Sequence, residues 1–148
     1  KSRKIFMKFK FSLAPVLKVR EHQEKIQKQK LAEQVSKKQK ISDLQNEVQG
    51  KLKQFLNDSE EQTAASIHLI RQRSMHLEQV HQKMEKLNKE LVQADITVSE
   101  EREKLASAHK KLHILEKVKE FEKGLFSEQA AKNEQKFMDE IATQSFSR

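Results

Sequence analysis

The chain has 148 residues, of which 35% are apolar and 35% charged, with two glycines, one proline and no cysteine. So little apolar surface excludes a thick globular core and favours long helices that each bury a narrow stripe. The lack of cysteine excludes disulfides, thiolate metal sites and cysteine nucleophiles. No stretch has the roughly 18 apolar residues of a membrane-spanning helix, or the apolar run of a signal peptide, so we expect a soluble, cytoplasmic protein.

The net charge of +8 is concentrated at the N-terminus, where seven basic residues precede the first acidic residue, Glu21. The remainder of the chain is almost balanced in charge. A nucleic-acid-binding helix carries positive charge along its length. We therefore expect no nucleic-acid partner.

Residues 1–11 alternate basic and apolar side chains and are predicted to form a basic N-terminal arm. A solvated tail, an amphipathic surface anchor and a short strand all remain open for this arm. The first helix is predicted over residues 12–56, with Ser12 as its cap and Pro15 in its first turn, where proline is tolerated. Its apolar stripe changes register between two runs, which are Val16, Val19 and Ile26, then Leu31, Val35, Ile41, Leu44, Val48, Leu52 and Phe55.

Asn57, Asp58 and Ser59 form the only cluster of helix-capping residues in the middle of the chain. Ser59 and Gln62 have the spacing of a capping box. We therefore predict a turn over residues 57–64.

The second helix, predicted over residues 65–148, has the strongest pattern in the sequence. Apolar residues stand seven apart without exception at Ile70, Leu77, Met84, Leu91, Val98, Leu105 and Leu112. The position three residues later is apolar in five of seven cases, at Val80, Leu87, Ala94, Ala108 and Leu115, the exceptions being Arg73 and Glu101. Beyond Leu115 the stripe is predicted to slip to Val118, Phe121 and Leu125, and Gly124 indicates either a kink in a continuous helix or a helix end.

The predicted fold is therefore all-α, a long antiparallel two-helix coiled-coil hairpin, because two stripes joined by a short turn cover each other most easily. The second helix is the longer one, so its last part overhangs the first helix. The stripe left uncovered there needs another protein, a second copy in a homo-oligomer, or the folded-back N-terminal arm. It comprises Leu112, Leu115, Val118, Phe121, Leu125 and Phe126.

The sequence lacks the motifs of common catalytic and cofactor sites, including phosphate-binding loops, dinucleotide fingerprints and nucleophile elbows. His109 and His113 are four residues apart on one helical face, a spacing that could hold a metal. The neighbouring Lys110 and Lys111 oppose a cation, so a solvated histidine pair is the favoured interpretation. We expect no enzyme activity, no cofactor and no metal.

Three stretches of the sequence are similar to the FliJ family of flagellar export proteins. MKFKFSLAPVLKVRE, starting at Met7, resembles the opening of that family, EREKLASAHKKLHILEKVKE resembles its long charged helix, and KFMDEIATQSF resembles its closing motif. The resemblance covers nearly the whole chain, but residues 1–6 precede the usual start.

The resemblance implies a hairpin like the central stalk of rotary ATPases, inside the hexameric ring of the flagellar type III export ATPase. The protein would promote ring assembly, contact the cytoplasmic domain of the membrane export gate and handle export chaperones. It would lie peripherally at the inner face of the cell membrane, at the flagellar base. It would thus serve flagellum biogenesis, protein transport and chemotaxis.

We predict that the hairpin end away from the turn binds the ATPase ring. The residues assigned to that contact are Phe9, Phe11, Leu13, Pro15, Leu17, Val118, Phe121, Leu125, Phe137, Met138, Asp139, Glu140 and Ile141. The gate contact is assigned to Ile41, Leu44, Val48, Leu77, Val80 and Met84, although these side chains could equally pack only on each other.

Two rival classes of protein remain open. A general structural adaptor would dimerise in parallel through the seven-residue repeat of the second helix. A membrane-surface or nucleic-acid binder would act through residues 1–20, with an affinity that falls steeply as salt rises.

Overall fold

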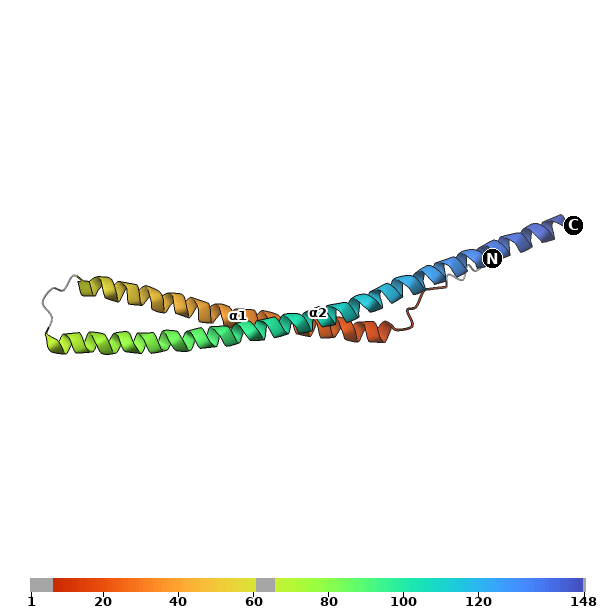
Figure 1. Cartoon of the computed structure of the whole chain (residues 1–148). Coiled ribbons are helices and arrows are strands. Elements are labelled where there is room, and N and C mark those ends of the chain that lie inside the picture. Colours follow the sequence, from red (N-terminus) through yellow and green to blue (C-terminus); the bar gives the residue numbers. More distant parts are fainter. Residues whose placement is uncertain (1–6, 61–65, 148) are drawn as a thin grey trace. The chain divides into compact units, whose positions relative to one another are not determined.

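The protein is an all-α helical hairpin, as the sequence predicts. The computed structural model describes residues 7–60 and 66–147 and contains two α-helices, α1 (Ala14–Glu60) and α2 (Ile67–Phe146), which pack against each other (Figure 1). No strand occurs among the described residues. Predictions that concern residues 1–6, 61–65 and 148 lie outside these ranges, including the role of Gln62.

The helices are long because few residues interrupt them. Pro15 is the second residue of α1, where the missing amide hydrogen has no helical partner to lose. Gly50 and Gly124 lie in open space, since a Cβ atom on either would meet nothing within 4 Å. α2 continues through Gly124 to Phe146, so Gly124 does not end the helix.

The helix ends differ from the predicted ones. α1 begins at Ala14, two residues after Ser12, whose hydroxyl bonds to α2 instead. Asn57, Asp58 and Ser59 were expected in the turn but belong to α1. The cap of α2 is Ser66, whose Oγ accepts a hydrogen bond from the Leu69 amide at 3.3 Å.

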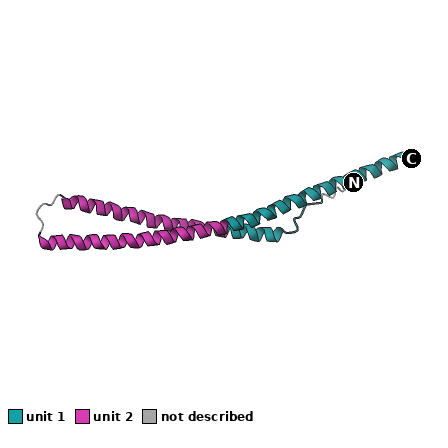
Figure 2. Cartoon of the chain, viewed as in Figure 1, with its two compact units in different colours: residues 1–25, 106–148 teal, residues 26–105 magenta. Residues whose placement is uncertain are grey.

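The chain forms two compact units, each built from a segment of both helices (Figure 2). Unit 1 contains residues 1–25 and 106–148, and unit 2 contains residues 26–105. Because α1 and α2 pair within each unit, each predicted surface can be described within a single unit.

The contact face of α2 follows the predicted seven-residue repeat over most of its length. Its shielded positions run with alternating spacings of three and four from Val80 to Leu115, and Val98, at 2% exposure, is the most buried. Ile70 and Leu77 belong to the same repeat but are exposed. The repeat therefore predicts the seam well, except near the start of α2.

The contact face of α1 matches the predicted apolar stripe only in part, since Leu31, Ile41, Val48, Leu52 and Phe55 are shielded as predicted. Val16, Val19, Ile26, Val35 and Leu44, which belong to that stripe, are all exposed. The shielded positions instead follow a regular repeat of three and four, in which polar residues are frequent. They are Leu17, Arg20, Glu24, Gln27, Leu31, Gln34, Lys38, Ile41, Gln45, Val48, Leu52, Phe55 and Ser59.

Three of the polar residues in the α1 seam have hydrogen-bond partners on α2. Lys38 Nζ lies 2.6 Å from Asp95 Oδ1, and Gln45 donates a hydrogen bond to Asn88. Gln27 Nε2 donates to the Glu101 carboxylate, and also to its main-chain oxygen at 3.3 Å. Each of these contacts pairs one position on α1 with one on α2, so together they favour a single register.

Two of these contacts lower carboxyl pKa values. The hydrogen bond and charge of Lys38 lower the pKa of Asp95, and the hydrogen bond from Gln27 lowers that of Glu101, with a smaller contribution from Lys104. Carboxyls with lowered folded-state pKa values stabilise the fold above their ordinary values of 3.8 and 4.5. This contribution is lost as the pH falls through the folded-state values.

We therefore expect the double variant Asp95→Asn, Glu101→Gln to lose part of the acid sensitivity of the protein. The measurement is the melting temperature by circular dichroism between about pH 6 and pH 2.5 for both proteins. The wild type should melt at a higher temperature near pH 6, and the difference should shrink as both approach pH 2.5. A constant difference over this range would contradict the assigned contacts.

Candidate partner-binding surfaces

The N-terminal arm and both helices form a small core in unit 1. Phe11, Leu17 and Leu112 are buried together, and the half-buried side chains of Phe9, Ala14, Leu115 and Val118 pack against them. Apolar contacts thus join the arm to the two helices. These contacts hold the surrounding surface side chains in defined positions.

The arm continues along α2 beyond this core. The Ser12 hydroxyl donates a hydrogen bond to Glu122 Oε1 at 2.8 Å, and the Phe9 and Phe126 rings lie 5.6 Å apart at 55°. The sequence left three candidates for covering the overhanging stripe of α2. In the structure, the folded-back arm covers part of it, including Phe126, and leaves Phe121 and Leu125 exposed.

This contact changes the predicted course of the α2 seam. The shielded positions beyond Leu115 are Val118, Glu122 and Phe126, whereas Phe121 and Leu125 are 68% and 51% exposed. The predicted slip to Phe121 and Leu125 is therefore wrong. The reason is that Ser12 and Phe9 contact the neighbouring face of α2. That face includes Glu122, which an apolar pattern cannot reveal.

The residues assigned to the ATPase ring fall into two groups. Phe9, Phe11, Leu17 and Val118 are shielded within unit 1 and hold it together. The others are exposed, namely Leu13, Pro15, Phe121, Leu125, Phe137, Met138, Asp139, Glu140 and Ile141. Only the second group presents side chains to a partner.

The final segment of α2, residues 127–146, is exposed along its whole length. Phe137, Met138 and Ile141 lie on one helical face, because spacings of three and four residues bring side chains together. Asp139 Oδ1 accepts a hydrogen bond from Gln135 at 3.1 Å on the same helix. The segment thus carries an apolar face that α1 does not cover.

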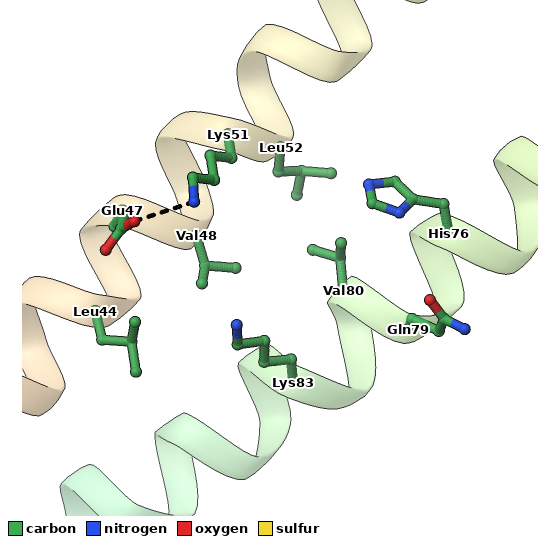
Figure 3. Close-up of a pocket in the computed structure, with 9 residues that line it drawn as sticks. All are labelled: Leu44, Glu47, Val48, Lys51, Leu52, His76, Gln79, Val80 and Lys83. Atoms are coloured by element: carbon green, nitrogen blue, oxygen red, sulfur yellow. Dashed lines mark ion pairs between the residues drawn. The ribbon is translucent and has the colours of Figure 1, made fainter.

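Some of the residues assigned to the gate line a pocket in unit 2. Leu44, Val48 and Val80 line this pocket, which has a volume of about 320 Å³ (Figure 3). Ile41 and Met84 are half-buried in the helix contact, and Leu77 does not line the pocket. Three of the six assigned residues are thus brought together at one surface.

The pocket also contains polar residues that sequence reasoning missed. Lys51 and Lys83 lie at its edge, and Lys51 Nζ is 3.0 Å from Glu47 Oε1 (Figure 3). His76 also lines it, with its ring 4.6 Å from that of Phe55. These residues lie next to the contact positions of each helix. They could therefore have been identified from the sequence once the α1 register was known.

His109 and His113 do not form a metal cluster with other ligands. Their rings are stacked, with the centroids 6.3 Å apart. His109 Nδ1 lies 3.6 Å from Glu24 Oε2, and His113 Nδ1 lies 3.9 Å from Glu116 Oε2. Among the described residues, no group of three potential ligands is close enough to hold a metal ion. Within residues 7–60 and 66–147, neither helix has a stretch apolar enough to cross a membrane.

The fold and these surfaces define a helical-hairpin protein with apolar side chains exposed in both units. The chain belongs to the FliJ family, since the family model described as the flagellar FliJ protein matches residues 9–148. No curated protein and no solved structure matches the chain. The family is a component of flagellar protein export and is not known as a family of enzymes.

Proposed function

We propose that this protein is the stalk of the flagellar export ATPase ring, promotes assembly of the ring, and connects it to the membrane export gate and to export chaperones. It would act at the cytoplasmic face of the membrane, at the flagellar base. The observation that carries the proposal is the final segment of α2, which belongs to the family match and exposes Phe137, Met138 and Ile141.

Unit 1 has properties suited to the ring contact. Its core of Phe11, Leu17 and Leu112 ties the arm to both helices, so the exposed side chains are presented from a defined surface. Ordered contact residues bind with a smaller entropic cost than residues that must first fold. Unit 1 is therefore our candidate for the end that contacts the ATPase.

The pocket of unit 2 is our candidate for the gate contact. Leu44, Val48 and Val80 supply an apolar floor, and Lys51 and Lys83 supply positive charge at the edge. We restrict the proposed contact to these residues, because Ile41 and Met84 already pack in the helix pair.

The alternative of a parallel homodimeric adaptor is less well supported. Such a dimer would use the seven-residue repeat of α2, including Leu87 and Val98. In the hairpin these side chains are 5% and 2% exposed. A dimer through that seam would have to displace α1.

The stalk proposal predicts that the triple variant Phe137→Ala, Met138→Ala, Ile141→Ala assembles the ATPase ring poorly. Loss of three apolar contacts should raise the protein concentration needed for half-maximal assembly by about tenfold or more. Assembly is measured by electron microscopy of the purified ATPase and by its hydrolysis rate.

The control is Met75→Ala, Val92→Ala, Ile96→Ala, which truncates three exposed apolar side chains in unit 2. Both variants should retain the wild-type helix content by circular dichroism. Normal ring assembly by the variant at positions 137, 138 and 141 would reject the proposed ring contact.

A further inference from the structure

The two helices have two distinct flanks beside their contact. Seven-residue positions are lettered a to g, with a at Leu17 and Leu112 and d at Arg20 and Leu115. Position a of α1 meets position e of α2, as in Lys38–Asp95 and Glu24–His109. Position d of α1 meets position g of α2 on the other side, as in Phe55–His76.

One flank of unit 1, formed by positions b and e, is charged. A shallow pocket on it is lined by Leu17, Glu21, Glu116, Lys119, Glu120 and Lys123. Lys18 and Lys25 occupy position b of α1 on the same flank. Carboxylates and ammonium groups alternate here, as is usual for a solvated helix surface. We call this the charged flank.

The opposite flank of unit 1 is apolar. It comprises residues at positions c, d and g that are 39% to 68% exposed, namely Leu13, Val16, Val19, Ile114, Phe121 and Leu125. Val118 lies among them and packs against the core of unit 1. We call this the apolar flank. The described part of the arm, residues 7–11, leaves it exposed, because Phe9 and Phe11 pack towards Phe126 and the core instead.

One end of the apolar flank is positively charged. Arg20 and Lys111 lie at one end of it, and the Arg20 guanidinium donates a hydrogen bond to Gln23 at 3.1 Å. Lys110 and Lys117 follow its outer edge at position f. From residue 111 to 125 of α2 and from residue 12 to 23 of α1, the one carboxylate at positions c, d or g is Glu122. It lies away from Arg20 and accepts a hydrogen bond from the Ser12 hydroxyl at 2.8 Å.

We propose that the apolar flank of unit 1 receives an amphipathic helix of the export ATPase, with its apolar stripe between α1 and α2 and its carboxylates beside Arg20 and Lys111. Two adjacent helices offer a groove that a third helix can fill. A contiguous exposed apolar patch marks an interaction site, and its positive end selects an acidic partner. The inference rests on the proposed function for the identity of the partner.

A second copy of the chain fits this flank less well. It would bring the same positive charges, and nearby carboxylates already have partners. Glu122 accepts a hydrogen bond from Ser12 at 2.8 Å, and Glu128 lies 3.0 Å from Lys132. Charge complementarity thus favours the acidic helix of a different protein.

Photocrosslinking can locate the occupant, because the chain contains no cysteine of its own. Phe121→Cys on the apolar flank and Lys123→Cys on the charged flank are each labelled with a benzophenone maleimide. Each protein is then mixed with the export ATPase of the same organism and illuminated. We expect at least about fivefold more ATPase adduct from position 121, with the adduct mapped to a helical, acidic peptide of the ATPase.

Charge reversal gives the second measurement. Arg20→Glu, Lys111→Glu should raise the Kd for the ATPase by about tenfold, whereas Lys18→Glu, Lys25→Glu should change it by less than about twofold. The two variants have the same net charge, so a difference between them reports the flank and not the total charge. Both are compared with the wild type at two salt concentrations.

The outcomes separate this inference from the stalk proposal. Equal adducts from both flanks, or equal effects of the two charge reversals, would overturn the inference while the stalk proposal stands. Adducts joining two copies of this chain at position 121 would overturn it in favour of self-association. If the wild type does not bind the ATPase at all, both proposals fail.

Discussion

Replacing Phe11 by alanine is expected to destabilise unit 1 by about 3 kcal/mol, a typical cost for truncating a buried phenylalanine. Phe11 is buried with Leu17 and Leu112 and joins the arm to both helices. Its loss leaves a cavity at that junction and weakens the support for the neighbouring Ser12–Glu122 hydrogen bond. Hydrogen exchange of amides in residues 14–20 and 112–118 should accelerate, while exchange in unit 2 changes less.

Phe121→Ala is the matched control, because it removes the same side chain from a residue that is 68% exposed. Its effect should lie within about 0.5 kcal/mol of the wild type. The comparison also tests the α2 register, since the apolar pattern alone predicts Phe121 in the seam. A larger effect for Phe121→Ala than for Phe11→Ala would show that the arm does not pack as described.

The fold could be predicted because its main determinants are local or periodic. Few prolines and glycines allow long helices, and the repeat through Leu87, Val98 and Leu112 marks one face of α2. These signals need no knowledge of the partner helix. They are sufficient for a helical hairpin and for most of the α2 contact face.

The contact face of α1 could be predicted only in part, because several of its positions are polar residues that pair with α2. Lys38 and Gln45 resemble solvated residues until Asp95 and Asn88 are placed opposite them. An apolar stripe drawn through Val35 and Leu44 misses these pairs. The α1 register is therefore a property of both helices together.

The candidate binding surfaces could be predicted only in part for a related reason. The sequence indicated an uncovered stripe on α2 but could not show that the arm covers Phe126 and leaves Phe121 and Leu125 exposed. It therefore did not separate the residues that stabilise unit 1, such as Phe11, from exposed residues such as Phe137. The two flanks of unit 1 also depend on the α1 register, so the apolar flank emerged only from the structure.

Val98→Asp is expected to destabilise unit 2 by about 3 kcal/mol or more, because it buries a carboxylate without a designed partner. Val98 is 2% exposed, and its position in the repeat places it between α1 and α2. The new carboxylate must be protonated, lose its hydration, or separate the helices. Urea unfolding followed by circular dichroism should show a clear loss of stability near pH 7, and the loss should be smaller near pH 4.

Val92→Asp is the control for this change, since Val92 lies on the same helix and is 62% exposed. Both variants carry the same intrinsic helix penalty of a few tenths of a kcal/mol for aspartate, so their difference isolates burial. If the hairpin forms in solution, Val98→Asp should lower the free energy of unfolding much more than Val92→Asp does. If the two substitutions were equally mild, α1 would not shield Val98 in solution, and the stiffness that a stalk needs could not come from the pairing of these helices.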